Sequence, residues 1–221
     1  MPNESHFKEP DQAKKDLEDV LNVVMNQLKQ LSVQWKLFCQ LFDSGGQNIK
    51  ILNSSGSAVF ALLQRLIIDD VMLSLYKLTD SEAPRHAKSE NASGNAKSEN
   101  ASIKNVVAKA KSFLTVQTNS TVSALIVEMD GYVKNVRTHR NKSLAHADLK
   151  HALKVCSLPP VTYDELEKAM KVVKEIVSKV ASEACGWTVP VTYNVIIPFG
   201  RGGDSLLNIL KLGHCGAAKG Q

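Results

Sequence analysis

The sequence predicts an all-α protein, an antiparallel helical bundle of about five helices with a C-terminal extended arm and a short terminal helix. Apolar residues recur every three or four positions through long stretches of the 221-residue chain, which is the period of an amphipathic helix. Helix start and stop signals separate these stretches. The alternating pattern of a strand occurs only after residue 186, where prolines interrupt it.

The first predicted helix covers residues 11–42. Pro10 suits its start, and the pair Gly45-Gly46 lies just beyond its end. Its apolar residues step alternately by four and three positions, and they are Leu17, Leu21, Val24, Leu28, Leu31, Trp35, Phe38 and Phe42. This spacing suits pairing with a second chain, and it equally suits antiparallel packing inside a bundle.

The second predicted helix covers residues 58–78 and is apolar nearly all round, which is typical of a helix in the middle of a bundle. The preceding residues 43–57 are rich in Ser, Asn and Gly and are predicted to form a loop. A flexible insertion is expected next, because a tandem repeat at 87–93 and 96–102 contains no large apolar residue that burial could order.

Three further helices are predicted in the second half of the chain. The first two cover residues 103–114 and 120–140, each with apolar residues on one side. Thr162 and Glu165 form the pattern of a capping box that opens the next helix, and Gly186 ends it.

The C-terminal part has a different pattern. Residues 187–199 alternate between apolar and polar, but Pro190 and Pro198 interrupt them, so we predict an extended arm laid along the bundle. Residues 200–203 resemble a phosphate-cradling loop before a short helix at 204–212. The lysine and hydroxyl of that pattern and a preceding parallel strand are missing, so nucleotide binding there is not favoured.

These predictions give a simple domain organisation: a flexible N-terminus at residues 1–10, a helical bundle at 11–185 and an arm with a short helix packed on the bundle at 186–221. The disordered insertion occupies 79–102. The first ten residues lack the apolar run of a signal peptide, and no window resembles a membrane span. We therefore expect a cytoplasmic protein with no membrane partner.

The basic charge is concentrated in one segment. The net charge of the chain is +5. Residues 131–154 contain six Lys or Arg side chains and a single acidic residue, so this segment accounts for the whole excess. Such a surface favours a polyanion such as RNA, because phosphate contacts dominate the affinity of nucleic-acid binding. An ordinary solvated face is the other interpretation.

A polar motif lies within this basic segment, at a predicted helix end. Arg140 and Asn141 are followed by His146. An arginine stays charged and forks onto phosphate oxygens, and a histidine exchanges a proton near neutral pH, so these types suit phosphodiester chemistry. Spacing alone also suits a helix-capping arginine and a surface histidine. On an unbroken helix six positions are about 120° apart, so the two side chains converge only if the helix bends near Asn141 or another chain supplies one of them.

An unpaired carboxylate on the second predicted helix is a candidate partner for this motif. Arg65 and Asp69 are four positions apart and can pair with each other, which leaves Asp70 without a local cation. Asp70 is therefore a possible orienting carboxylate for Arg140 or His146, or a member of a structural ion pair elsewhere.

Three blocks of the chain resemble the HEPN superfamily of small α-helical proteins, and within it the AbiU-type abortive-infection branch. Residues 140–146 look like the arginine, polar residue, spacer and histidine signature of the superfamily. Residues 66–80 look like the second core helix of the branch, and residues 203–207 look like its short terminal helix. The likeness covers most of residues 11–212.

The resemblance implies a metal-independent ribonuclease, with no cofactor, that acts as the toxin of an abortive-infection or toxin-antitoxin locus. It implies a homodimer whose motifs meet at the interface, and an antitoxin protein as a possible partner. His146 would transfer a proton during attack by the ribose 2′-hydroxyl, Arg140 would stabilise charge on the phosphate, and Asn141 would position one of these groups. From the charge pattern, the candidate RNA contacts are Arg137, His139, Lys142, Lys134 and Lys150.

One departure from the family pattern affects regulation. Some HEPN toxins have a tyrosine two residues after the histidine that a partner nucleotidyltransferase modifies, whereas this chain has Asp148. Many members of the superfamily are also inactive. The alternative function is therefore a non-catalytic helical module that binds a partner protein or a nucleotide.

Overall fold

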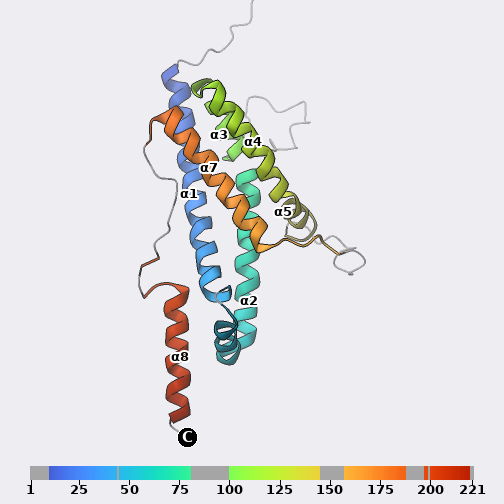
Figure 1. The fold of residues 1–221 in the computed structure, drawn as a ribbon, viewed down its shortest axis with the longest axis vertical. Helices are drawn as coiled ribbons and strands as arrows, with labels where there is room; N and C mark the ends of the chain where they lie inside the picture. Colours follow the sequence, from blue (N-terminus) through green and yellow to red (C-terminus); the bar gives the residue numbers. More distant parts are fainter. Residues whose placement is uncertain are drawn as a thin grey trace, which may run out of the picture. The chain divides into compact units, whose positions relative to one another are not determined.

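A computed structural model describes residues 10–43, 45–80, 100–144, 157–187, 197–198 and 200–219. Every regular element in these ranges is helical, which confirms the predicted all-α class (Figure 1). The elements are α1 (Pro10–Phe42), α2 (Gly46–Thr79), α3 (Ile103–Ala110), the 3-10 turn η1 (Lys111–Phe113), α4 (Val116–Tyr132), α5 (Lys134–His139), the π-helical turn η2 (Arg140–Leu144), α7 (Tyr163–Cys185) and α8 (Gly203–Lys219).

The chain forms two compact units. The first unit contains the chain up to Leu28 and Leu75–Thr192, and the second contains Lys29–Ser74 and the chain from Tyr193. Both long N-terminal helices therefore contribute to each unit: α1 enters the second unit after Leu28, and α2 leaves it after Ser74.

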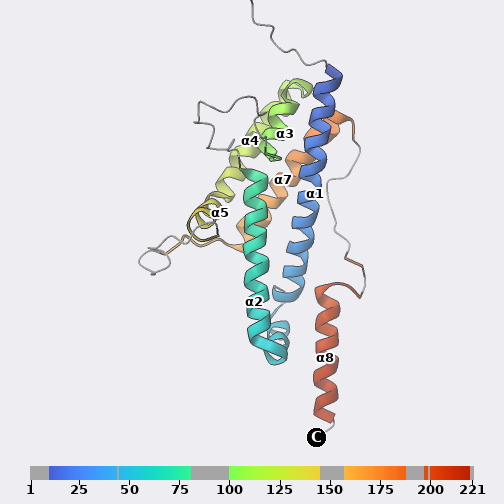
Figure 2. The same ribbon diagram turned by 180° about the vertical axis from the view of Figure 1, so that it is seen from behind.

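The core of the first unit is built on α7. This helix packs against α4 and α3, and Figure 2 shows α3 beside α4 on the same side of it. The predicted capping box is present, because Thr162 and Glu165 exchange side-chain-to-backbone hydrogen bonds at the start of α7, and Gly186 ends the helix in the left-handed conformation (φ 70°). The buried face of α7 is Leu166, Ala169, Met170, Val172, Val173, Ile176, Val177, Val180, Ala181 and Ala184.

The predicted apolar seam of α1 is buried. Leu17, Leu21, Val24, Leu28, Leu31 and Phe38 have no exposed surface. Trp35 and Phe42 are partly exposed and contact Phe38, with ring centroids 5.5 and 5.4 Å away; the Trp35 ring is stacked on Phe38 and the Phe42 ring is tilted. Packing inside the chain therefore accounts for much of this seam.

The loop predicted at residues 43–57 is wrong, because α2 begins at Gly46. Leu52 is almost fully buried and forms a small core with Leu41 and Leu207 in the second unit. Burial of such side chains outweighs the weak helix propensity of the Ser, Asn and Gly residues around them. The helix is interrupted at Gly56, where φ is 159° and ψ is 68°.

The helix predicted at 120–140 begins earlier and is broken. Thr115 caps α4 by accepting a hydrogen bond from the Thr118 backbone at 3.2 Å. Glu183 of α7 accepts hydrogen bonds from the Thr115 backbone and the Thr118 hydroxyl, which ties this start to the core. At the other end, Val133 has a non-helical ψ of 2° and separates α4 from α5.

In the second unit, α8 is longer than predicted and packs closely on α1. A Cβ atom on Gly203 would lie 2.9 Å from Cβ of Gln40 and from Cγ of Leu41, so the first turn of α8 touches α1 where only a hydrogen fits. Leu207 continues this contact.

Several predictions fall outside the described residues. The insertion is described only at its ends, where Thr79 completes α2 and Ser102 caps α3. Most of the predicted arm also lies outside, at 188–196 and 199. Among the helices that the structure describes, none has the length and apolar character needed to cross a bilayer.

Candidate functional site

The motif arginine lies where α-helical geometry ends. The helix α5 stops at His139, and residues 140–144 form the π-helical turn η2. Turns of this type are rare and frequently lie at functional sites. If Arg140 and His146 converge within one chain, the helix must bend near Asn141. The change from α-helical to π-helical geometry occurs at this position. His146 itself lies outside the described residues, so its placement stays a prediction.

Arg140 lies over an aromatic ring. Its guanidinium carbon Cζ is 4.6 Å from the ring centroid of Tyr76, which belongs to the last turns of α2. Nη1 donates a hydrogen bond to Oδ1 of Asn141 at 3.0 Å. Tyr76 is 8% exposed, whereas Arg140 is partly exposed. A buried ring therefore supports a guanidinium that solvent still reaches, and this contact stabilises the cation's position.

An open polar pocket of about 320 Å³ lies beside this pair. All of its lining residues belong to the first unit, and they are Gln27, Tyr76, Lys77, Asp80, Asn100, Ala101 and Arg140. Two cations, one carboxylate and two amides meet there. The volume is at the small end of the range for ligand pockets, about 300–1,000 Å³.

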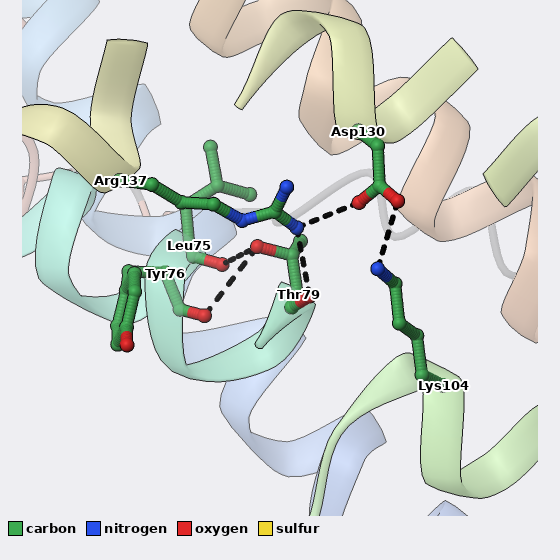
Figure 3. A network of polar contacts seen from close by, with 6 residues as sticks. All are labelled: Leu75, Tyr76, Thr79, Lys104, Asp130 and Arg137. Carbon is green, nitrogen blue, oxygen red and sulfur yellow. Dashed lines mark hydrogen bonds and ion pairs between the residues drawn. The ribbon is translucent and has the colours of Figure 1, made fainter. Parts of the chain in front are cut away.

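Arg137 takes part in a network that connects four helices (Figure 3). Its Nη2 donates to Oδ1 of Asp130 at 2.6 Å and to the backbone carbonyl of Thr79 at 3.1 Å. Lys104 donates to the other carboxylate oxygen of Asp130 at 2.7 Å. The Thr79 hydroxyl in turn donates to the carbonyl of Leu75 at 2.9 Å. The network thus links the end of α2, α3 and the α4–α5 segment.

The charge of Asp130 is set by this network. Partial burial raises the pKa of Asp130, but the hydrogen bonds and positive charges of Lys104 and Arg137 outweigh burial and hold the pKa below its usual range. The carboxylate is therefore ionised at neutral pH and keeps both cations in place. Because Arg137 is one turn before Arg140, the network also fixes the helix end from which Arg140 projects.

His139 and Asn135 attach the segment before α7 to α5. Nε2 of His139 is 2.7 Å from the carbonyl oxygen of Pro159, and the Asn135 amide donates to the carbonyl of Pro160 at 3.0 Å. With Nε2 protonated, His139 donates to that carbonyl. The side chains of Arg137 and His139 are thus engaged with protein groups, and their contacts with RNA stay predictions.

The remaining predicted site residues are Lys134, Lys142, Lys150 and Asp70. Lys134 and Lys142 are exposed, as backbone contacts to RNA require, and Lys150 lies outside the described residues. Asp70 accepts a hydrogen bond from the side-chain amide of Gln34 within the second unit. Its proposed orientation of Arg140 stays a prediction.

Residues 200–203, which resemble a phosphate loop, lead into α8, and the first residues of α8 form hydrogen bonds with Gln40 of α1. The Gly203 N–H donates to Oε1 of Gln40 at 3.0 Å, and Oδ2 of Asp204 accepts from Nε2 of the same side chain at 2.7 Å. One glutamine therefore occupies the start of α8. Among the described residues, no three His, Cys, Asp or Glu side chains are grouped as metal ligands.

Sequence reasoning missed two important residues, Tyr76 and Asp130. Asp130 is seven positions before Arg137 and so lies on the same helical face, which was a usable signal for an ion pair. Tyr76 belongs to the block at 66–80, but nothing in its spacing indicates a contact with Arg140, because 63 intervening residues separate them.

Comparison with known proteins identifies a family. A protein-family model described as AbiU2, of the HEPN type, matches residues 14–193, which is more than three quarters of the chain. This range contains Tyr76, Asp130, Arg137, Arg140 and His146. No curated protein and no solved structure matches the chain.

Proposed function

The chain belongs to the AbiU2 family of HEPN proteins, and on that premise we propose that it is a metal-independent endoribonuclease that cleaves RNA by attack of the ribose 2′-hydroxyl. The observation that carries the proposal is the position of Arg140. Its guanidinium lies over Tyr76, lines an open pocket and stays partly exposed. A held but accessible guanidinium suits a phosphate whose negative charge grows during the reaction.

The reaction divides between two side chains. The 2′-oxygen attacks phosphorus while the bond to the 5′-oxygen breaks, which leaves a 2′,3′-cyclic phosphate and a 5′-hydroxyl. His146 removes the proton from the 2′-hydroxyl or supplies one to the leaving oxygen. Arg140 stabilises the charge on the non-bridging oxygens, and Asn141 holds the guanidinium through the bond at 3.0 Å.

The surrounding charge supports binding of a polyanion. Lys77 and Arg140 line the pocket, and Lys134 and Lys142 are exposed on the same polar segment as Arg140. Contacts from such cations to phosphates raise affinity without selecting a sequence. The strand would therefore be held by its backbone.

Membership of the family supports a proposal for the biological setting. The proposal is a cytoplasmic toxin of an abortive-infection or toxin-antitoxin system, which acts as a homodimer and is restrained by an antitoxin protein. In a dimer, the histidine of one chain can act beside the arginine of the other. The two side chains can then meet without a bend in the helix of either chain.

Growth and cleavage assays test the proposal. We compare wild type with His146→Ala for toxicity on expression and for cleavage of mixed RNA in the presence of a chelator. The matched control is His214→Ala, a histidine of the second unit that contacts the hydroxyls of Ser54 and Ser55 at 3.1 and 2.8 Å. The proposal is supported if His146→Ala loses both activities and His214→Ala keeps them. Equal toxicity and equal cleavage in wild type and His146→Ala would remove the proposal. Absence of cleavage in all three proteins would favour a non-catalytic module that binds a partner protein or a nucleotide.

A further inference from the structure

One face of α2 is apolar and exposed. Val59, Leu62 and Leu66 are 66%, 48% and 53% exposed, and all three lie in the second unit. They are three and four positions apart, so they form one stripe along the helix. On another side of the same helix, Phe60 and Leu63 pack against the small core of this unit. A helix that is apolar nearly all round is typically covered on every side, so the stripe is the side that the described part of the chain leaves uncovered.

The stripe has the spacing of a coiled-coil seam. With Val59 and Leu66 in the a positions of two successive heptads, Leu62 takes the d position between them. Valine at a followed by leucine at d is a combination that favours two strands. Asp69 takes the next d position, so the apolar part of the seam covers about two helical turns. The stripe therefore suits a short contact with one further helix.

Two exposed charged residues flank the stripe on opposite edges. Arg65 and Asp70 are five positions apart, which places them about 140° apart around the helix axis. They take the g position of one heptad and the e position of the next. In a parallel pair of helices, the g edge of each helix faces the e edge of the other, and the facing residue is five positions later in the sequence. Arg65 and Asp70 have this spacing, with opposite charges.

The charges distinguish a parallel pair from an antiparallel one. In an antiparallel pair related by a two-fold axis, each edge faces the same edge of the other copy, so Arg65 would face the edge that carries Arg65. In a parallel pair it faces the edge that carries Asp70. The side-chain amide that donates to Oδ2 of Asp70 belongs to Gln34 and is neutral, so this bond does not neutralise the carboxylate.

We infer that a second copy of this chain covers the exposed stripe. The two α2 helices pair in parallel through Val59, Leu62 and Leu66, and Arg65 of one copy forms an ion pair with the partner subunit's Asp70. The two-fold axis repeats every contact, so one helix face supplies both the matching apolar stripe and the complementary charges. The inference rests on the proposed homodimer and deepens it by naming the face through which the two copies associate.

The oligomeric state of the full chain tests the apolar stripe. Sedimentation over a series of concentrations should show a dimer of wild type that dissociates on dilution, because the seam is short. Leu62→Glu should raise the dissociation constant by at least about 10-fold, since it places two charges in the contact. Val127→Glu, at a valine of α4 that is 73% exposed in the first unit, is the control and should leave it unchanged. A wild type that is monomeric at every concentration, or a dimer that folded Leu62→Glu leaves intact, would overturn the inference.

Charge reversal tests the parallel arrangement. Arg65→Glu and Asp70→Lys each remove both ion pairs from their own dimer, so each should dimerise more weakly, by about 2- to 30-fold if each lost pair is an exposed one. Lys29→Glu, at an exposed lysine of α1 in the same unit, is the control and should dimerise as wild type does.

A mixture of the two charge variants restores both pairs. Glu at position 65 of one copy then faces Lys at position 70 of the other, and the native Arg65 and Asp70 face each other on the second edge. Native mass spectrometry should therefore show more mixed dimer than the half expected from random exchange. This result does not depend on the Gln34 bond that Asp70→Lys removes, because the same folded chains are compared in different pairs. A random proportion of mixed dimer would contradict the parallel arrangement.

These measurements contain no RNA, so they separate this inference from the nuclease proposal. Cleavage by wild type that sediments as a monomer removes the inference and leaves the nuclease. A dimer that responds to the variants as described, in a protein that does not cleave RNA, supports the inference and removes the nuclease.

Discussion

The guanidinium of Arg140 lies 4.6 Å above the ring of Tyr76, so two residues separated by 63 others form one contact at the candidate site. The ring is buried and belongs to α2, whereas Arg140 projects from the π-helical turn after α5. A cation over the face of an aromatic ring gains about 0.5–2 kcal/mol, depending on its exposure to solvent. The contact orients the guanidinium. One N–H group of Nη1 is bonded to Asn141, and the proposal assigns other N–H groups to a phosphate.

Replacement of Tyr76 tests this contact. Tyr76→Leu keeps the buried position apolar but removes the ring face, so RNA cleavage should fall by roughly 2- to 30-fold, the rate equivalent of that energy. Tyr76→Phe keeps the ring and should retain most of the activity. The rates are measured with a saturating RNA after unfolding curves confirm that both variants are folded. Equal rates for Tyr76→Leu and wild type would show that the contact between Tyr76 and Arg140 does not contribute to cleavage.

Asp130→Asn tests the network that supports the helix end. Loss of the carboxylate leaves Lys104 and Arg137 without their shared anion, and the free energy of unfolding at pH 7 should fall by about 1–2 kcal/mol, allowing for partial exposure. Asp164→Asn removes a partner of an exposed pair with Lys168 and should cost much less. Urea unfolding of the two variants gives the comparison.

The stabilising effect of Asp130 should depend on pH. The pKa of Asp130 is lower in the folded chain than in the unfolded chain, where it is about 4. Its contribution to the unfolding free energy is therefore fully present above the unfolded pKa, and it is lost as the pH falls through the lower folded pKa. The difference in unfolding free energy between wild type and Asp130→Asn should therefore be constant near neutral pH and shrink below about pH 4. A difference that persists undiminished in acid would mean that the carboxylate charge is not its cause.

Two glycines of α8 test the packing of the second unit. Gly203→Ala places a Cβ atom 2.9 Å from atoms of Gln40 and Leu41, so the unfolding free energy should fall by about 1–3 kcal/mol. At Gly213 no atom lies within 4 Å of an added Cβ, and Gly213→Ala should be neutral or should stabilise the helix by up to about 1 kcal/mol. Thermal unfolding measures both. A destabilised Gly213→Ala with a neutral Gly203→Ala would contradict the packing.

Local signals in the sequence predicted most of the helices, because caps and periodic apolar residues act within a few positions. The seam of α1 and the capping box of Thr162 and Glu165 are examples. The start of α2 was predicted wrongly, because its helicity depends on the burial of Leu52 against Leu41 and Leu207, which are distant in sequence.

The site shows the same division between local and distant information. The type and spacing of Arg140 and Asn141 identify a candidate for phosphate chemistry, and the change to a π-helical turn occurs at these residues. The support of Arg140 by Tyr76 and the ion pairs of Asp130 with Lys104 and Arg137 are tertiary. The seven-position spacing of Asp130 and Arg137 was a usable signal for their ion pair. Periodicity cannot identify the contacts of Tyr76 with Arg140 and of Lys104 with Asp130, since these partners are far apart in the sequence.

The most direct test of the central claim is a double-mutant cycle on RNA cleavage. The rates of Arg140→Ala, His146→Ala and the combined variant are measured on one defined RNA in chelator, with His214→Ala as the control outside the site. If the two side chains act on the same phosphodiester, each single change lowers the rate by at least about 100-fold and the double change costs little more than one of them. Single variants that cleave at the wild-type rate would contradict the account.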